Sequence, residues 1–143
     1  MDLSTLTMDA VRALDDSGLR RVVAELLDYR VVPCEGASNA GRFHVVCGDT
    51  EAQWCGRSVE EAWGMSLARV ETWLNIPDYV RDLNAAVELL PIDWELSRMN
   101  EGEFYWCKLD RDMVGLEQAN TPARAICLAW IAWRLAQQEA AHG

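Results

Sequence analysis

Five cysteines and two histidines are the residues best suited to metal or redox chemistry in this chain of 143 residues. His44 and Cys47 are three residues apart, in a segment that alternates as a strand does. An odd offset on a strand points two side chains to opposite faces, where they cannot share an ion. The odd cysteine number, without a C-x-x-C motif, argues against a disulfide framework. We therefore expect no metal, no cofactor, and reduced, buried cysteines that act as small hydrophobic side chains. The cysteines are Cys34, Cys47, Cys55, Cys107 and Cys127.

Aromatic and arginine side chains near two predicted helix starts could form a ligand site. Arg57 precedes the first helix start, and Arg124 lies in the first turn of the second. Free N–H groups at a helix start attract anions. If Trp54 and Trp106 lie on neighbouring strands, their rings could stack a nucleobase. These four residues are the predicted ligand-binding residues, and the alternative is a pair of capped helix ends with exposed arginines.

No residues form a recognisable catalytic set. Ser58 and Ser66 have no histidine partner at a spacing that supports nucleophilic catalysis, and no phosphate-binding glycine motif occurs. Asp93 and Glu95 share one face of a predicted strand, but their alternation with apolar residues marks them as solvent-facing. The loop over 110–115 is similar to a calcium loop, except that Val114 stands where a side-chain oxygen is expected. We therefore expect no catalytic residues and no enzyme activity.

Hydrophobic periodicity predicts the same order of elements twice along the chain. The first half has a helix over 17–28 after the N-cap Ser17, strands over 30–33, 42–47 and 53–55, and a helix over 58–74 that begins with a capping box at Ser58. The second half has a helix over 83–90, strands over 92–97 and 104–109, and a helix over 121–137 with Thr121 as N-cap.

The two halves align as copies of one helix–meander–helix unit. Residues 23–27 (VAELL) correspond to residues 86–90 (AVELL), and the capped helix starts fall at matching positions. One unit alone would leave a sheet face or edge bare, so two are expected to pack together. The sequence therefore predicts an α+β fold, a single domain over 1–143 with one shared core, and an internal duplication with pseudo-repeats over 17–75 and 78–138.

The net charge of −10 argues against direct binding to nucleic acid or an anionic membrane, because both need clustered basic residues. No apolar run approaches the roughly 20 residues of a membrane span, and the first residues lack a signal-peptide pattern. We therefore expect a soluble, cytoplasmic protein. The seven tryptophans are expected to fill the core, with Trp54 the least buried because it lies near a loop.

The segments 82–96 (DLNAAVELLPIDWEL) and 120–127 (NTPARAIC) resemble the phage ABA-sandwich domain, a family of uncharacterised phage and prophage proteins related to NinX. The resemblance covers about residues 19–135, and its motifs are structural. It implies an α/β/α sandwich with an antiparallel sheet, and a bacteriophage origin. It supplies no catalytic residues.

These observations lead us to expect a small acidic phage accessory protein in the host cytoplasm. It would bind and modulate a host or phage protein, for example by inhibiting a bacterial defence system. The alternative is a sponge that binds a small nucleotide signal. The helix over 121–137 is apolar on two faces, so Ile131 and Leu135 predict either a homodimer or a companion helix within the chain.

Overall fold

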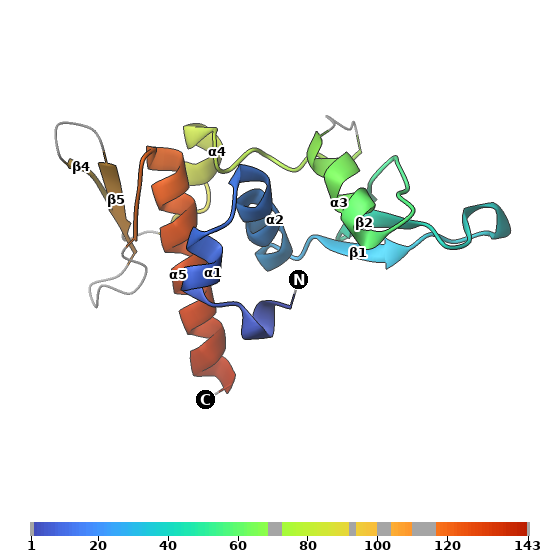
Figure 1. Cartoon of the computed structure of the whole chain (residues 1–143), viewed down its shortest axis with the longest axis horizontal. Coiled ribbons are helices and arrows are strands. Elements are labelled where there is room, and N and C mark those ends of the chain that lie inside the picture. The colour runs from blue at the N-terminus through green and yellow to red at the C-terminus, as the bar shows by residue number, and fades with distance from the viewer. Residues whose placement is uncertain (1, 69–72, 92–93, 100–103, 110–116, 143) are drawn as a thin grey trace. The chain divides into compact units, whose positions relative to one another are not determined.

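The computed structural model describes residues 2–68, 73–91, 94–99, 104–109 and 117–142 (Figure 1). They group into two compact units. Unit 1 comprises Met1–Val23 and Asp78–Gly143, and unit 2 comprises Ala24–Pro77. The fold is α+β, with two three-stranded antiparallel sheets and helices packed against them, which confirms the predicted class.

Unit 2 contains a sheet with strand order β1-β2-β3. Its elements are β1 (Arg30–Pro33), the 3-10 helix η2 (Ala37–Asn39), β2 (Phe43–Cys47), β3 (Thr50–Glu51) and α3 (Val59–Ala68). The strands predicted over 30–33 and 42–47 are confirmed. The strand predicted over 53–55 is wrong, because Gly48, with φ +59, allows a two-residue turn after which pairing resumes at Thr50.

The core of unit 2 forms between its sheet and helix α3. Val45 of β2 and Trp63 of α3 are both buried in this cluster. The other buried members are Ala24, Ala52, Leu74 and Ile76. All of these residues belong to unit 2, and the single core predicted for the whole chain stays a prediction.

Unit 1 contains the second sheet, with strand order β4-β5-β6. Its elements are the 3-10 helix η1 (Leu3–Thr5), α1 (Met8–Arg12), the first part of α2 (Asp16–Leu26), α4 (Leu83–Val87), β4 (Glu95–Met99), β5 (Phe104–Lys108), β6 (Glu117–Ala119) and α5 (Pro122–His142). Strand β6 was not predicted from the sequence, because three residues with one apolar member show no periodicity. Helix α5 begins where predicted and continues beyond residue 137.

Helix α5 is the centre of unit 1, and its two apolar faces both have partners there. It packs against β5 and β6 on one side, and α1 and α4 also contact it. In Figure 1, α5 runs between the β4–β5 strands and α1. Leu128 and Ile131 are therefore buried within the chain itself. Leu135, on the same face, is half-buried, and the homodimer stays a prediction.

The order of elements repeats as predicted. Helix α2 is followed by the meander β1–β3 and α3, and α4 is followed by the meander β4–β6 and α5. The division after Pro77 agrees with the predicted boundary between the pseudo-repeats, but residues 1–23 group with the second of them. The duplication itself stays a prediction.

Two of the three predicted helix caps are confirmed. Ser58 Oγ accepts a hydrogen bond from the amide of Glu61, and Thr121 Oγ1 accepts one from the amide of Arg124. Helix α2 differs, because the carboxylate of Asp15 accepts from the amide of Gly18 and takes the place predicted for Ser17. The predictions for Val70, for 92–93, for the turn over 100–102 and for the loop over 110–115 fall outside the described residues.

The tryptophans divide between core and surface. Trp63 and Trp130 are buried, as predicted, and Trp54 is exposed, as its place near a loop indicated. The core prediction is wrong for Trp73 and Trp94, which are exposed. Among the helices that the structure describes, none has the length and hydropathy that a membrane crossing requires.

Candidate functional site

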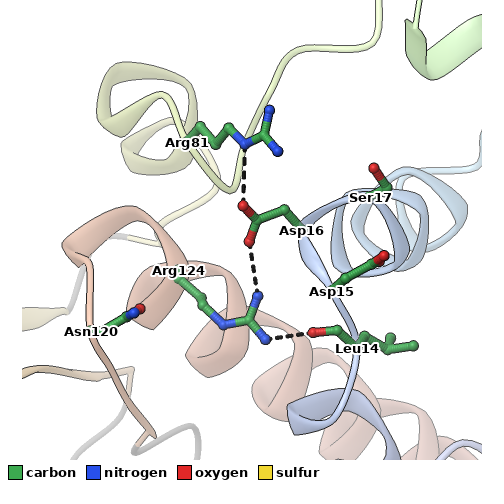
Figure 2. A pocket seen from close by; sticks show the side chains of 7 residues that line it. All are labelled: Leu14, Asp15, Asp16, Ser17, Arg81, Asn120 and Arg124. Carbon is green, nitrogen blue, oxygen red and sulfur yellow. Dashed lines mark hydrogen bonds and ion pairs between the residues drawn. The ribbon is translucent and has the colours of Figure 1, made fainter.

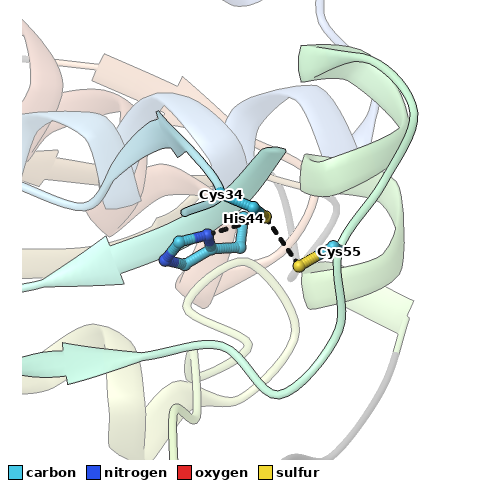
Figure 3. A group of neighbouring side chains, drawn as sticks. All are labelled: Cys34, His44 and Cys55. Atoms are coloured by element: carbon cyan, nitrogen blue, oxygen red, sulfur yellow. Dashed lines mark hydrogen bonds between the residues drawn. The ribbon is translucent and has the colours of Figure 1, made fainter. Parts of the chain in front are cut away.

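A cluster of two cysteines and one histidine lies at one end of the sheet in unit 2. Cys34 directly follows β1, His44 lies in β2, and Cys55 follows β3. The antiparallel register places Val32 opposite His44, and the amide of Cys34 donates to the carbonyl of Arg42. These pairings bring the chain after β1 back beside β2, so that Cys34 meets His44. Figure 3 shows the three side chains turned toward one another.

Gly56 holds Cys55 against the cluster. Its amide donates to the carbonyl of Phe43 at 2.7 Å, and its carbonyl accepts from the amide of Phe43 at 2.8 Å. A Cβ at position 56 would lie 2.5 Å from the backbone nitrogen of Ala62, so only glycine lets this loop approach the start of α3 so closely. Because Gly56 pairs with Phe43, which directly precedes His44, the neighbouring Cys55 lies beside His44.

The donor atoms of the cluster are within contact distance. Cys34 Sγ lies 2.7 Å from Cys55 Sγ and 3.1 Å from His44 Nδ1. Burial and the hydrogen bond to Cys55 raise the pKa of Cys34 to about 11. All three cluster donors lie within 4.8 Å of one another, which is a spacing at which one metal ion could contact all of them. Both cysteines are free thiols here.

The second ring nitrogen of His44 faces a carboxylate. His44 Nε2 is buried without a hydrogen-bond partner among the described residues, and Glu51 Oε1 lies 3.7 Å away. The cluster also lines a pocket of about 260 Å³, together with Val32, Pro33, Glu35, Asn39, Glu51 and Ala52. The site is thus open on one side to a small polar cavity.

The sequence prediction of no metal ligands missed this cluster. It compared His44 only with Cys47 and treated every cysteine as buried, whereas Cys34, Cys47 and Cys55 are only half-buried. The available signal was the predicted pairing of strands 30–33 and 42–47. That pairing places the residue after the first strand beside the start of the second, where His44 lies.

Arg124, one of the predicted ligand-binding residues, already has hydrogen-bond and ion-pair partners within the chain. Its guanidinium pairs with Asp16 at 3.2 Å and donates to the carbonyl of Leu14 at 2.7 Å. Arg81 pairs with the other oxygen of Asp16, also at 3.2 Å. Figure 2 shows Asp16 between the two arginines, in a pocket of about 450 Å³ whose other lining residues are Leu14, Asp15, Ser17 and Asn120. The arrangement joins the start of α2 to α5.

We expect the replacement of Arg124 by alanine to destabilise unit 1. The Arg124 side chain is only 17 % exposed, and it bonds both the carboxylate of Asp16 and the partly buried carbonyl of Leu14. Its loss should therefore cost about 2–3 kcal/mol of unfolding free energy. Urea denaturation measures this change. Arg57→Ala is the control, because Arg57 is exposed and should change stability by less than about 0.5 kcal/mol. Equal stability of the two variants would show that the Asp16 pairing contributes nothing.

Of the four predicted ligand-binding residues, Trp54 and Arg57 belong to unit 2, and Trp106 and Arg124 belong to unit 1. Trp106 lies in β5, between β4 and β6, whereas Trp54 lies outside the strands, after β3. The premise that they occupy neighbouring strands is therefore wrong. Arg57 is exposed and stands beside the capped start of α3. No protein-family model matches the chain, and no match was found among curated proteins or solved structures.

Proposed function

We propose that this protein is a non-enzymatic phage accessory protein that binds a host or phage protein through the outer face of the β4–β5–β6 sheet. Helix α5 packs against the other face, where Cys107 is fully buried. Since side chains alternate along a strand, Phe104 and Trp106 point away from α5. Phe104 is 41 % exposed and Trp106 is half-buried. This pair of aromatic rings on the sheet face opposite α5 is the observation that carries the proposal.

The residues around the two rings suit a protein interface. Ser97 and Gln118 stand opposite Trp106 on the neighbouring strands, and Glu95 stands opposite Lys108. Aromatic anchors with polar neighbours are typical of binding hot spots. The outer face is defined here by Glu95, Ser97, Phe104, Trp106, Lys108 and Gln118.

The charge of the chain favours a basic partner. A net charge of −10 attracts positively charged surfaces and repels polyanions, so it speeds association with basic proteins. Proteins that bind nucleic acid have such surfaces, and a bacterial defence protein of this kind is the specific partner that we would test first. The resemblance to phage proteins supports the same setting, the cytoplasm of an infected host cell.

The nucleotide alternative has less support. A phosphate bound by Arg124 would have to displace the carboxylate of Asp16 and compete with the carbonyl of Leu14. The helix start beside it is capped by Thr121. We therefore propose that the partner binds at the outer face of the β4–β5–β6 sheet and not in the pocket that Arg124 and Asp16 line.

Affinity capture from a bacterial lysate tests the proposal. The wild-type chain should retain a basic protein at low salt, and bait carrying Phe104→Ser should retain much less of it. Val87→Ser is the matched control, because Val87 is similarly exposed at 39 % but lies on α4, outside the sheet. Equal recovery with wild-type and Phe104→Ser bait, or no specific protein at all, would contradict the proposal.

A further inference from the structure

We propose that Cys34, His44 and Cys55 form a binding site for one zinc ion. Two cysteine sulfurs and one imidazole nitrogen are a ligand set that Zn²⁺ takes in proteins. The three residues come from three different segments of the β1–β3 meander, and their donor atoms converge within 4.8 Å. Its residues belong to unit 2, whereas the outer face of the second sheet belongs to unit 1, so neither proposal depends on the other.

The chemistry of the donors selects the metal. Thiolate sulfur is a soft ligand that favours Zn²⁺ over Mg²⁺ and Ca²⁺, which prefer oxygen. Cys34 and His44 Nδ1 are 3.1 Å apart, and Cys55 Sγ lies 2.7 Å from Cys34 Sγ. Zn–S bonds of about 2.3 Å hold two tetrahedral ligand sulfurs about 3.8 Å apart, so the thiols would separate by roughly 1 Å around the ion. Both sulfurs would lose their protons when zinc binds.

Glu51 is placed to orient the histidine. When Nδ1 of His44 is the ligand, Nε2 carries the ring hydrogen, and this atom faces Glu51 Oε1 at 3.7 Å. A metal-bound histidine commonly has such a carboxylate partner on its other nitrogen. An interaction with Glu51 would also explain the position of His44 Nε2, which is buried and has no hydrogen-bond partner among the described residues.

The fourth coordination position would face the pocket. Three protein ligands leave one tetrahedral position, and a pocket of about 260 Å³ adjoins the cluster. Water or an exchangeable anion can occupy a position of this kind. We therefore infer a zinc ion with three protein ligands and one replaceable ligand.

Zinc titration of the reduced, chelator-treated full chain tests the site. The wild type should bind about one Zn²⁺ per chain, measured by competition with a chromophoric chelator and by elemental analysis after dialysis. Cys34→Ser and Cys55→Ser should each retain less than about a tenth of that zinc. Cys47→Ser is the matched control, since Cys47 is also half-buried in this sheet but lies outside the cluster, and it should bind as the wild type does.

Cobalt substitution keeps the test independent of how well the variants fold. Co²⁺ added to the reduced wild type should give the intense visible absorption of a tetrahedral ion and a sulfur-to-metal charge-transfer band. Glu51→Gln should keep the full stoichiometry and weaken zinc binding about tenfold or more, as loss of a positioning carboxylate does. A reduced wild type that binds no zinc, or octahedral cobalt without the charge-transfer band, would overturn the proposal. So would zinc loss in Cys47→Ser equal to that in Cys34→Ser.

Discussion

Replacing Ile131 with glutamate is expected to unfold unit 1. Ile131 has no exposed surface in the chain, and it lies on the helix that packs against β5, β6, α1 and α4. A carboxylate buried there without a partner should cost about 5 kcal/mol or more, which is as large as the whole stability of many domains. Urea denaturation followed by near-ultraviolet circular dichroism measures the loss.

Gln137→Glu is the control for the Ile131 variant. It introduces the same charge on the same helix at an exposed position, so its stability should stay within about 0.5 kcal/mol of the wild type. The comparison also decides the question of the homodimer. An Ile131→Glu variant that stays folded and runs as a monomer, beside a dimeric wild type, would place Ile131 at a subunit interface and contradict the fold described above.

Replacing Arg12 with alanine should also destabilise unit 1 strongly, because it leaves the carboxylate of Glu117 without its partner. Arg12 donates two hydrogen bonds to Glu117, at 3.0 and 2.6 Å, and the Glu117 side chain is only 7 % exposed. The hydrogen bond with Glu117 raises the pKa of the Arg12 guanidinium. Loss of one partner from a buried pair costs about 3–5 kcal/mol, and the half-exposure of Arg12 lowers our expectation to about 2–3 kcal/mol.

Two further variants separate this ion pair from other effects of the Arg12 side chain. Asp9→Ala removes the other carboxylate partner of the Arg12 side chain, but the Asp9 side chain is 96 % exposed, so stability should change by less than about 0.5 kcal/mol. The double variant Arg12→Ala with Glu117→Gln should be more stable than Arg12→Ala by about 1 kcal/mol, because no unpaired charge remains. If the double variant is no more stable than Arg12→Ala, the unpaired charge of Glu117 does not account for the stability that Arg12→Ala loses.

The elements that could be predicted from sequence are those with a local cause. Alternation identified β2, and Thr121 followed by Pro122 identified the start of α5 to the residue. The short strand β6 could not be found this way, because its pairing with β5 is what makes it a strand. The cap of α2 was misplaced because Asp15 and Ser17 are both good caps, and only the fold decides between them.

The candidate sites needed contacts between residues far apart in the sequence. Arg124 was predicted to bind an anion because no residue near it in the sequence indicates its ion pair with Asp16, which lies in another helix. The cysteine–histidine cluster depends on the register of β1 with β2 and on the close approach that Gly56 allows. The predicted pairing of strands 30–33 and 42–47 could have placed Cys34 beside His44, but no local pattern shows that Cys55 reaches the same place, so the full ligand set could not be assembled from spacing alone.

The affinity of the captured partner for wild-type and variant chains is the most direct measurement of the binding role. Isothermal titration calorimetry at low salt should show that Phe104→Ser weakens binding at least about tenfold, which is 1.4 kcal/mol, because an aromatic anchor is lost. Val87→Ser should bind as the wild type does, and the affinity of all three proteins should fall as salt is raised. Equal affinities for the wild type and Phe104→Ser would contradict the assignment of the partner to the outer face of the β4–β5–β6 sheet.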